Sequence, residues 1–175
     1  SNGDKLFVLI AILLLLVYIL PAIFLVFHYE KHFSVPFYLL GIGLFFGSFV
    51  PGWLAAYGNE FAGNLTNIVS YGNNHVKEWL TALSAPIVEE TVKACCALAL
   101  IYLFNRRRPS EVFFIGACVG LGFQMLEDVS YIVNQANESM KDLFPQTLLR
   151  ISGAISSHWA YTGLFVLGLF CLLTK

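Results

Sequence analysis

The sequence predicts an all-α fold, a polytopic membrane bundle of about five transmembrane helices. Of the 175 residues, 58% are hydrophobic and only 12% are charged, and the mean hydropathy is positive. Soluble domains have about 45–50% apolar and about 25% charged residues. Several apolar runs also reach the roughly 20 residues that one bilayer crossing needs. We therefore expect a multi-pass integral membrane protein in contact with a lipid bilayer.

The first two spans follow from uninterrupted apolar runs. Residues 6–27 are long enough to cross the bilayer and too long for a signal peptide. Pro21 is expected to kink this helix. Residues 36–57 form the second run, in which Gly43 and Gly47 have the four-residue spacing that lets helices pack closely.

Residues 58–78 are polar, with glycine and asparagine breaks, and are expected to form a surface loop. A stripe of apolar residues in this loop could also form a helix lying flat at the membrane interface. Three further spans are expected at residues 79–104, 111–133 and 147–173. The whole chain, residues 1–175, is predicted to be a single transmembrane domain.

Three consecutive arginines at residues 106–108 form the densest basic cluster. Short loops rich in Lys and Arg stay on the cytoplasmic side, so the span at 79–104 is expected to end inside. The segments 58–78 and 134–146 then lie outside. The net charge is −1 and no basic patch extends beyond this cluster, so no nucleic-acid partner is expected.

Charged residues within the apolar segments mark the expected functional site. They are Glu89, Glu90, Lys93, Glu127, Asp128 and His158. A charged side chain near the bilayer centre costs ~3 kcal/mol on insertion scales. All of these residues except His158 are counted as ionised. The five charges together would cost about 15 kcal/mol, which is comparable with the stability of a whole domain. These residues must therefore pair with one another or line a water-filled cavity.

The three charged segments are expected at similar depths in the bilayer. At 1.5 Å per helical residue, Glu90 lies ~15 Å from the outer start of its span and Glu127 roughly 10 Å from its outer end. His158 lies about 12 Å below Arg150. The agreement predicts one shared site in the outer half of the bilayer. The alternative is a coincidental match between uncertain helix boundaries.

Helical spacing predicts contacts within the site. Glu89 and Lys93 are four residues apart and Glu90 and Lys93 three, so the lysine can neutralise one glutamate while the other faces elsewhere. Phe123 and Glu127 share a helix face, which places the aromatic ring in the expected site. The alternative for Glu127 and Asp128 is that they form hydrogen bonds between helices and take no part in a reaction. A lone histidine in a membrane usually has the same structural role.

The sequences EETVK and FQMLE, together with His158 and Thr162, match the motifs EExxK, FxxxE and HxxxT. Over residues 80–165 the chain resembles the PrsW family of intramembrane proteases, related to the CAAX prenyl endopeptidases and the Abi or CPBP membrane proteases. The resemblance implies a peptide hydrolase of the bacterial cytoplasmic membrane that cleaves a membrane-anchored protein such as an anti-sigma factor. Family members commonly continue with further spans, which implies that this chain is part of a longer protein.

Peptide hydrolysis requires an activated water and donors for the developing oxyanion, and the candidate residues offer both. Glu89 or Glu90 is expected to activate the water, and Lys93 to orient and balance that pair. Glu127 is expected to share in water positioning or proton transfer. His158 would stabilise the oxyanion or protonate the leaving amine.

A divalent metal held by Glu90, Glu127 and His158 is the close alternative, because carboxylates and imidazole bind such ions. Because the expected site contains one histidine and the sequence has no HExxH spacing, a glutamate-activated water is favoured over zinc, so no cofactor is expected. Two other classes remain open. One is a membrane scaffold or immunity protein that is not an enzyme. The other is a proton-coupled transporter, although the sequence lacks the internal repeat typical of transporters.

Overall fold

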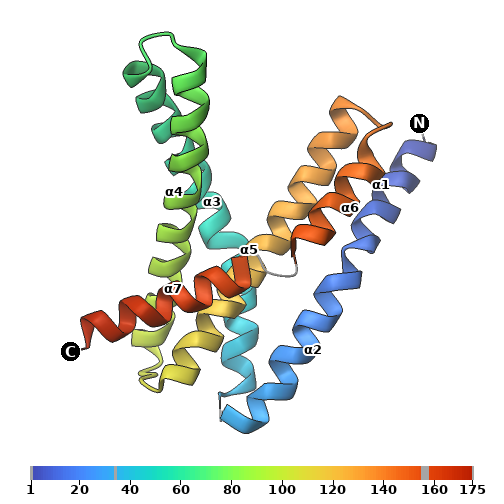
Figure 1. Ribbon diagram of the computed structural model, residues 1–175. Coiled ribbons are helices and arrows are strands. Elements are labelled where there is room, and N and C mark those ends of the chain that lie inside the picture. The colour runs from blue at the N-terminus through green and yellow to red at the C-terminus, as the bar shows by residue number, and fades with distance from the viewer. Residues whose placement is uncertain (1, 34, 155–157, 175) are drawn as a thin grey trace.

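A computed structural model of the chain describes residues 2–33, 35–154 and 158–174 (Figure 1). Within these residues the chain forms helices and no strand. The helices are α1 (Asn2–Leu14), α2 (Leu16–Phe33), α3 (Phe37–Val69), α4 (Asn74–Leu103), α5 (Pro109–Glu138), α6 (Leu143–Ala154) and α7 (His158–Leu173). The prediction of an all-α membrane bundle is confirmed. The helices correspond to five predicted runs, because α1 and α2 share the first run and α6 and α7 the last.

Length and composition allow four stretches to cross a membrane. They are Asp4–Val26, Phe37–Val69, Pro109–Glu138 and Leu143–Leu173. Helix α4 is not among these stretches, because Glu89, Glu90 and Lys93 lie in its middle. Large apolar side chains such as Phe24 and Phe45 are exposed on the outside of the bundle. This is the surface that a lipid-embedded protein presents, since the bilayer core is as apolar as these side chains.

Helix α5 is the centre of the bundle and contacts every other helix. Its buried residues include Val112, Ile115 and Val119, which pack in one core with residues of α3, α4 and α7. Figure 1 shows two arms diverging from this centre, one formed by the α3–α4 hairpin and the other by α1, α6 and the C-terminal part of α5. Glu89, Glu127 and His158 belong to α4, α5 and α7, three helices that contact one another.

Helices α1 and α2 together form the first predicted run. They are separated at Leu15, and α2 continues through Pro21, where we expected the kink. Their buried side includes Ala11 and Tyr18 and packs in a second core with residues of α5 and α6. Tyr18 thereby reaches α5 from the N-terminal part of the chain.

The surface loop predicted at residues 58–78 is wrong. Helix α3 continues to Val69 and α4 begins at Asn74, so that the two helices form a long hairpin. Gly58 does not end the helix but permits close packing, because a Cβ atom at this position would lie 2.5 Å from Cγ1 of Val88. A glycine at a helix contact was therefore mistaken for a helix breaker.

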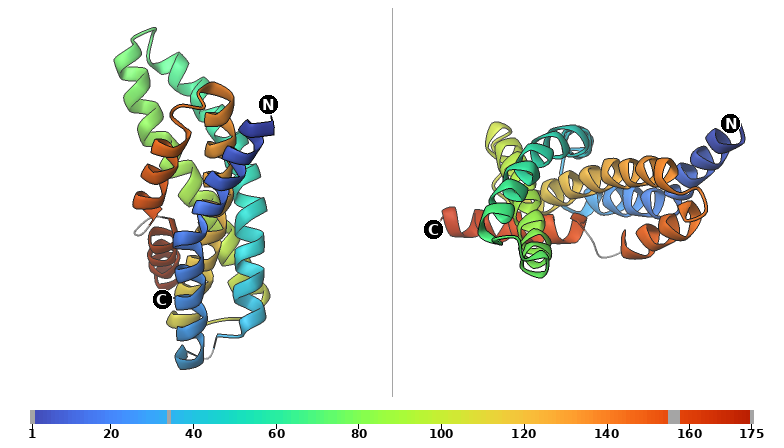
Figure 2. Two further views of the ribbon diagram at one scale, coloured as in Figure 1. Left: turned by 90° about the vertical axis from the view of Figure 1, so that its right-hand side faces the viewer. Right: turned by 90° about the horizontal axis from the view of Figure 1, so that it is seen from above.

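The span predicted at residues 147–173 lies within the candidate stretch Leu143–Leu173, but two helices, α6 and α7, form it instead of one. Helix α6 follows one arm of the bundle, whereas α7 lies across the centre and is seen nearly end-on in the left view of Figure 2. The two helices bind different faces of α5. Arg150 of α6 pairs with Asp128, and the backbone of α7 closes onto Gly120. A hydropathy profile alone does not show that α6 and α7 contact α5 at different residues.

Gly120 sets the approach of α7 to α5, and its replacement provides a first prediction. A Cβ atom at this position would lie 2.3 Å from the carbonyl oxygen of His158. We expect Gly120→Ala to lower the free energy of unfolding by about 1–3 kcal/mol, as overpacking does, and to displace His158. The measurement is thermal unfolding in detergent. Gly168→Ala is the matched control, because open space surrounds that glycine of α7. Equal melting temperatures for the two variants would contradict the close approach.

Candidate active site

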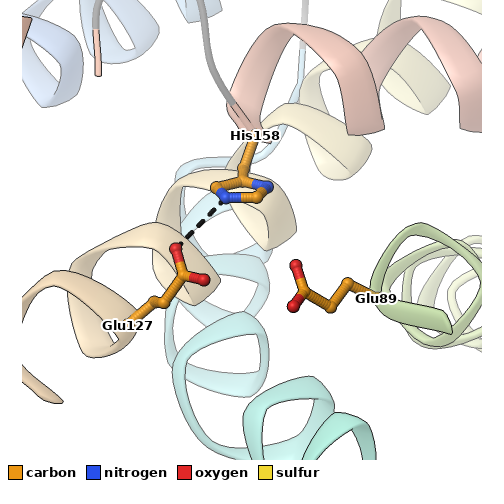
Figure 3. A group of neighbouring side chains, drawn as sticks. All are labelled: Glu89, Glu127 and His158. Atoms are coloured by element: carbon orange, nitrogen blue, oxygen red, sulfur yellow. Dashed lines mark ion pairs between the residues drawn. The ribbon is translucent and has the colours of Figure 1, made fainter. Parts of the chain in front are cut away.

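Three helices supply the polar side chains that the sequence analysis singled out. Glu89, Glu90 and Lys93 lie in the middle of α4, Glu127 lies on α5, and His158 is the first residue of α7. Figure 3 shows Glu89, Glu127 and His158 pointing toward one another from these three helices. The common location expected from their matching depths is therefore present in the structure.

Lys93 is the most enclosed member of the site, with no exposed surface. Its Nζ lies 2.5 Å from Oε1 of Glu90 and 2.6 Å from Nδ1 of His158. An ammonium group can only donate, so Nδ1 acts as the acceptor and the imidazole proton lies on Nε2. The ring of Phe123 lies 4.3 Å from Nζ and packs edge-on against the His158 ring. Lys93 and Phe123 together hold the imidazole in place.

Glu90 is the glutamate that Lys93 neutralises. Its second oxygen, Oε2, accepts a hydrogen bond of 2.9 Å from the hydroxyl of Thr162, which is fully buried. Thr162 lies four residues after His158 on α7, so both side chains reach the same part of the site. The HxxxT spacing pointed to Thr162, but we did not include it among the expected site residues.

Glu89 lies on a different face of α4 and is held less tightly. Nδ2 of Asn59 donates to Oε1 of Glu89 at 3.3 Å. The other amide atom of Asn59, Oδ1, is buried and has no hydrogen-bond partner among the described residues. Sequence analysis missed Asn59 because it placed this part of α3 in a surface loop.

Glu127 and Asp128 share one cation. Oε2 of Glu127 lies 3.2 Å from Nε2 of His158 and 2.5 Å from Nη2 of Arg150. Asp128 also binds Arg150 and accepts a hydrogen bond of 2.6 Å from the hydroxyl of Tyr18. Arg150 entered the sequence analysis only as a depth marker. An isolated arginine in the apolar segment that follows the segment with the acidic pair was the signal that could have identified it, because that pair needs a cation.

The donor set fits a divalent cation. One ligand atom each from Glu89, Glu127 and His158 lies within 4.8 Å of the others. Two ligands of one ion at ~2.1 Å are at most about 4.2 Å apart, so a shift of less than an ångström would bring them onto one ion. Glu90, which we expected in this set, instead bonds to Lys93 and Thr162.

The charges of the site do not balance. Four carboxylates face two cations, which leaves two formal negative charges when the imidazole is neutral. The groups are Glu89, Glu90, Glu127, Asp128, Lys93 and Arg150. An uncompensated charge is costly at membrane depth. A divalent cation would cancel the excess, as would protonation of Glu89 and His158.

Half-buried carboxylates and an imidazole inside a membrane bundle can activate water away from the bulk solvent, as a hydrolase acting within the membrane requires. The chain belongs to the PrsW family. The family model described as "PrsW family intramembrane metalloprotease" matches residues 35–175, a range that includes all three motifs. The protein is therefore an intramembrane peptidase that acts on a protein substrate. Comparisons with curated proteins and with solved structures gave no match.

Proposed function

We propose that this protein hydrolyses a peptide bond of a membrane-anchored protein with a water molecule activated between Glu89 and Glu127. The observation that carries the proposal is the convergence of these carboxylates with His158, within 4.8 Å and from three helices. Peptide hydrolysis requires a base near the water and a proton donor near the leaving nitrogen. Both kinds of group are present in this cluster.

The roles follow from how tightly each group is held. Glu90 is engaged by Lys93 and Thr162, so Glu89 is the better candidate to take the proton of the attacking water. The Nε2–H group of His158 can stabilise the oxyanion and then protonate the leaving amine, while Lys93 supplies a proton to Nδ1. Lys93 acts through His158, because it fixes the ring orientation from the Nδ1 side.

The donor set and the charge excess favour a divalent metal as a second candidate for the same site. Glu89, Glu127 and His158 would hold the ion, and His158 would bind it through Nε2 after that nitrogen had lost its proton. When bound, such an ion would polarise the peptide carbonyl and make water more acidic. The sequence alone favoured a glutamate-activated water. The description of the family as metalloproteases supports the metal.

We propose a bacterial cytoplasmic membrane protein whose substrate resembles a membrane-held anti-sigma factor. The support is the order and spacing of the three motifs, which also agree with a relation to the CAAX and CPBP proteases. With residues 106–108 inside, the site lies in the outer half of the bilayer.

A labelling experiment tests this orientation. In a variant without the native cysteines, Arg107→Cys should react with a membrane-impermeant thiol reagent only after the membrane is permeabilised. Tyr71→Cys, at the highly exposed turn of the α3–α4 hairpin, is the matched control and should react in intact cells. Reaction of Arg107→Cys in intact cells would reverse the orientation and move the site to the inner half of the bilayer.

Metal content and chelation distinguish the two mechanisms. If a metal is bound, the purified protein should retain about one divalent ion per chain and Glu89→Gln should lose it. Cleavage of a membrane-anchored substrate in proteoliposomes should then stop on chelation and return when metal is added. Cleavage that resists chelators, in protein that carries no ion, would leave the carboxylates as the sole activators of water.

A further inference from the structure

We propose that Arg150 is a positioning residue that keeps the carboxylate of Glu127 turned toward Glu89 and His158. The proposal rests on the proposed function, in which Glu127 acts directly on the water. Arg150 lies on α6, outside the three motifs, and has no expected contact with the substrate. Its effect would be exerted entirely through Glu127.

Arg150 binds two successive carboxylates at once. Its Nη2 lies 2.5 Å from Oε2 of Glu127 and 2.5 Å from Oδ1 of Asp128, and its Nε also donates to Oδ1 of Asp128. Successive side chains on a helix point about 100° apart. The planar guanidinium, with five donors, can bridge that angle, whereas the compact ammonium of a lysine provides only a point charge.

Asp128 anchors Arg150 from the side away from the reaction. Its side chain is 1% exposed, and its Oδ2 accepts the hydrogen bond from Tyr18 of α2. The ring of Tyr131 covers the guanidinium, with Cζ of Arg150 4.3 Å from the ring centroid. These contacts fix the arginine without any contribution from Glu127.

Helix α6 presents Arg150 from its buried side. Leu143, Thr147 and Ala154 are buried, and with Arg150 they follow the spacing of one helix face. The packing of this face sets the distance between Arg150 and α5. An isolated arginine in an apolar helix is thereby placed against the acidic pair of its neighbour.

Glu127 needs the contact with Arg150 because Glu89 and Glu127 carry the same charge. Two carboxylates that approach each other in a poorly solvated site repel, and the less restrained one turns away. Arg150 opposes this movement by holding Oε2 of Glu127, the same oxygen that contacts Nε2 of His158. Misplacement of a reacting group by about 1 Å can cost about 100-fold in rate.

Kinetics of Arg150 variants in proteoliposomes test the proposal. We expect Arg150→Met to lower kcat by roughly 100-fold with little change in KM, and Arg150→Lys to lie between this variant and the wild type. Added methylguanidinium should restore activity to Arg150→Ala, which leaves space for it, but not to Glu127→Gln. Tyr18→Phe, which removes only the hydroxyl bound to Asp128, should lower kcat by a smaller factor. Thermal unfolding of each variant shows whether the loss of rate follows a loss of stability.

A readout without activity separates this proposal from the proposed function. The ¹⁵N chemical shift of Nε2 of His158, assigned with His158→Gln, reports the contact with Glu127. It should change in Arg150→Met, and to a smaller degree in Tyr18→Phe. A wild-type protein that cleaves nothing would refute the proposed function, while this shift would still decide the role of Arg150.

The positioning role is overturned by a folded Arg150→Met variant with wild-type kcat or an unchanged His158 shift. It is also overturned if kcat falls only in proportion to stability and methylguanidinium restores nothing. If Arg150→Met does not fold, Tyr18→Phe and Asp128→Asn test the positioning role instead. Each of these variants weakens the contacts that hold Arg150 and keeps the arginine itself. Wild-type kcat and an unchanged His158 shift in both folded variants would refute the proposal.

Discussion

Replacement of Glu89 or Glu127 by glutamine is expected to reduce cleavage of a membrane-anchored substrate by at least ~100-fold, the usual effect of losing an acid/base group. The amide has nearly the same volume as the carboxylate but cannot take a proton from water. The fold should remain intact, because each substitution removes a negative charge from a site where carboxylates outnumber cations. Initial rates in proteoliposomes, with helicity and thermal unfolding measured in parallel, provide the test.

Glu60→Gln is the matched control for these variants. Glu60 also lies on a membrane helix, α3, where its side chain is exposed and points about 100° away from that of Asn59, which bonds to Glu89. This variant should cleave at the wild-type rate. Full activity in both Glu89→Gln and Glu127→Gln would exclude the hydrolytic role that we assign to these carboxylates.

Lys93→Met is expected to destabilise the protein by about 3–5 kcal/mol, the typical cost of removing one partner of a buried ion pair. Lys93 is fully buried, and its loss leaves Glu90 without its cation at membrane depth. The double variant Lys93→Met/Glu90→Gln should recover most of this stability, since no unpaired charge remains. It should not recover activity, because the contact with Nδ1 of His158 is still absent.

Equilibrium unfolding of the wild type, both single variants and the double variant gives the coupling energy of the pair. A Lys93→Met variant as stable as the wild type would show that water or another group compensates Glu90.

The sequence was sufficient to predict the helical class and the meeting of the three motifs. Charges at Glu90, Glu127 and His158 are costly in lipid, which requires them to meet whatever the details of packing. The three-residue spacing of Glu90 and Lys93 similarly predicts their ion pair, because helix geometry alone sets that contact. These predictions depend on local geometry and on the bilayer, both of which can be inferred without the fold.

Contacts between distant segments could not be inferred in this way. Tyr18 and Asp128 are 110 positions apart, and no spacing rule connects them. Asn59 was assigned to a loop because the neighbouring Gly58 resembled a helix breaker. In the structure, the lack of a side chain at Gly58 permits α3 to pack on α4. The separate directions of α6 and α7 follow from their contacts with α5, and hydropathy does not register such contacts.

The most direct test of a hydrolytic site formed by Glu89, Glu127 and His158 within the membrane is mass spectrometry of the reaction products. Protein reconstituted in proteoliposomes would be given a membrane-anchored substrate in ¹⁸O-enriched water. The account predicts two fragments from a cut in the outer half of the substrate's span, with ¹⁸O in the new carboxyl group. Glu127→Gln should form these fragments at least ~100-fold more slowly. Identical fragments at an unchanged rate from Glu127→Gln, or no fragments from the wild type, would contradict the account.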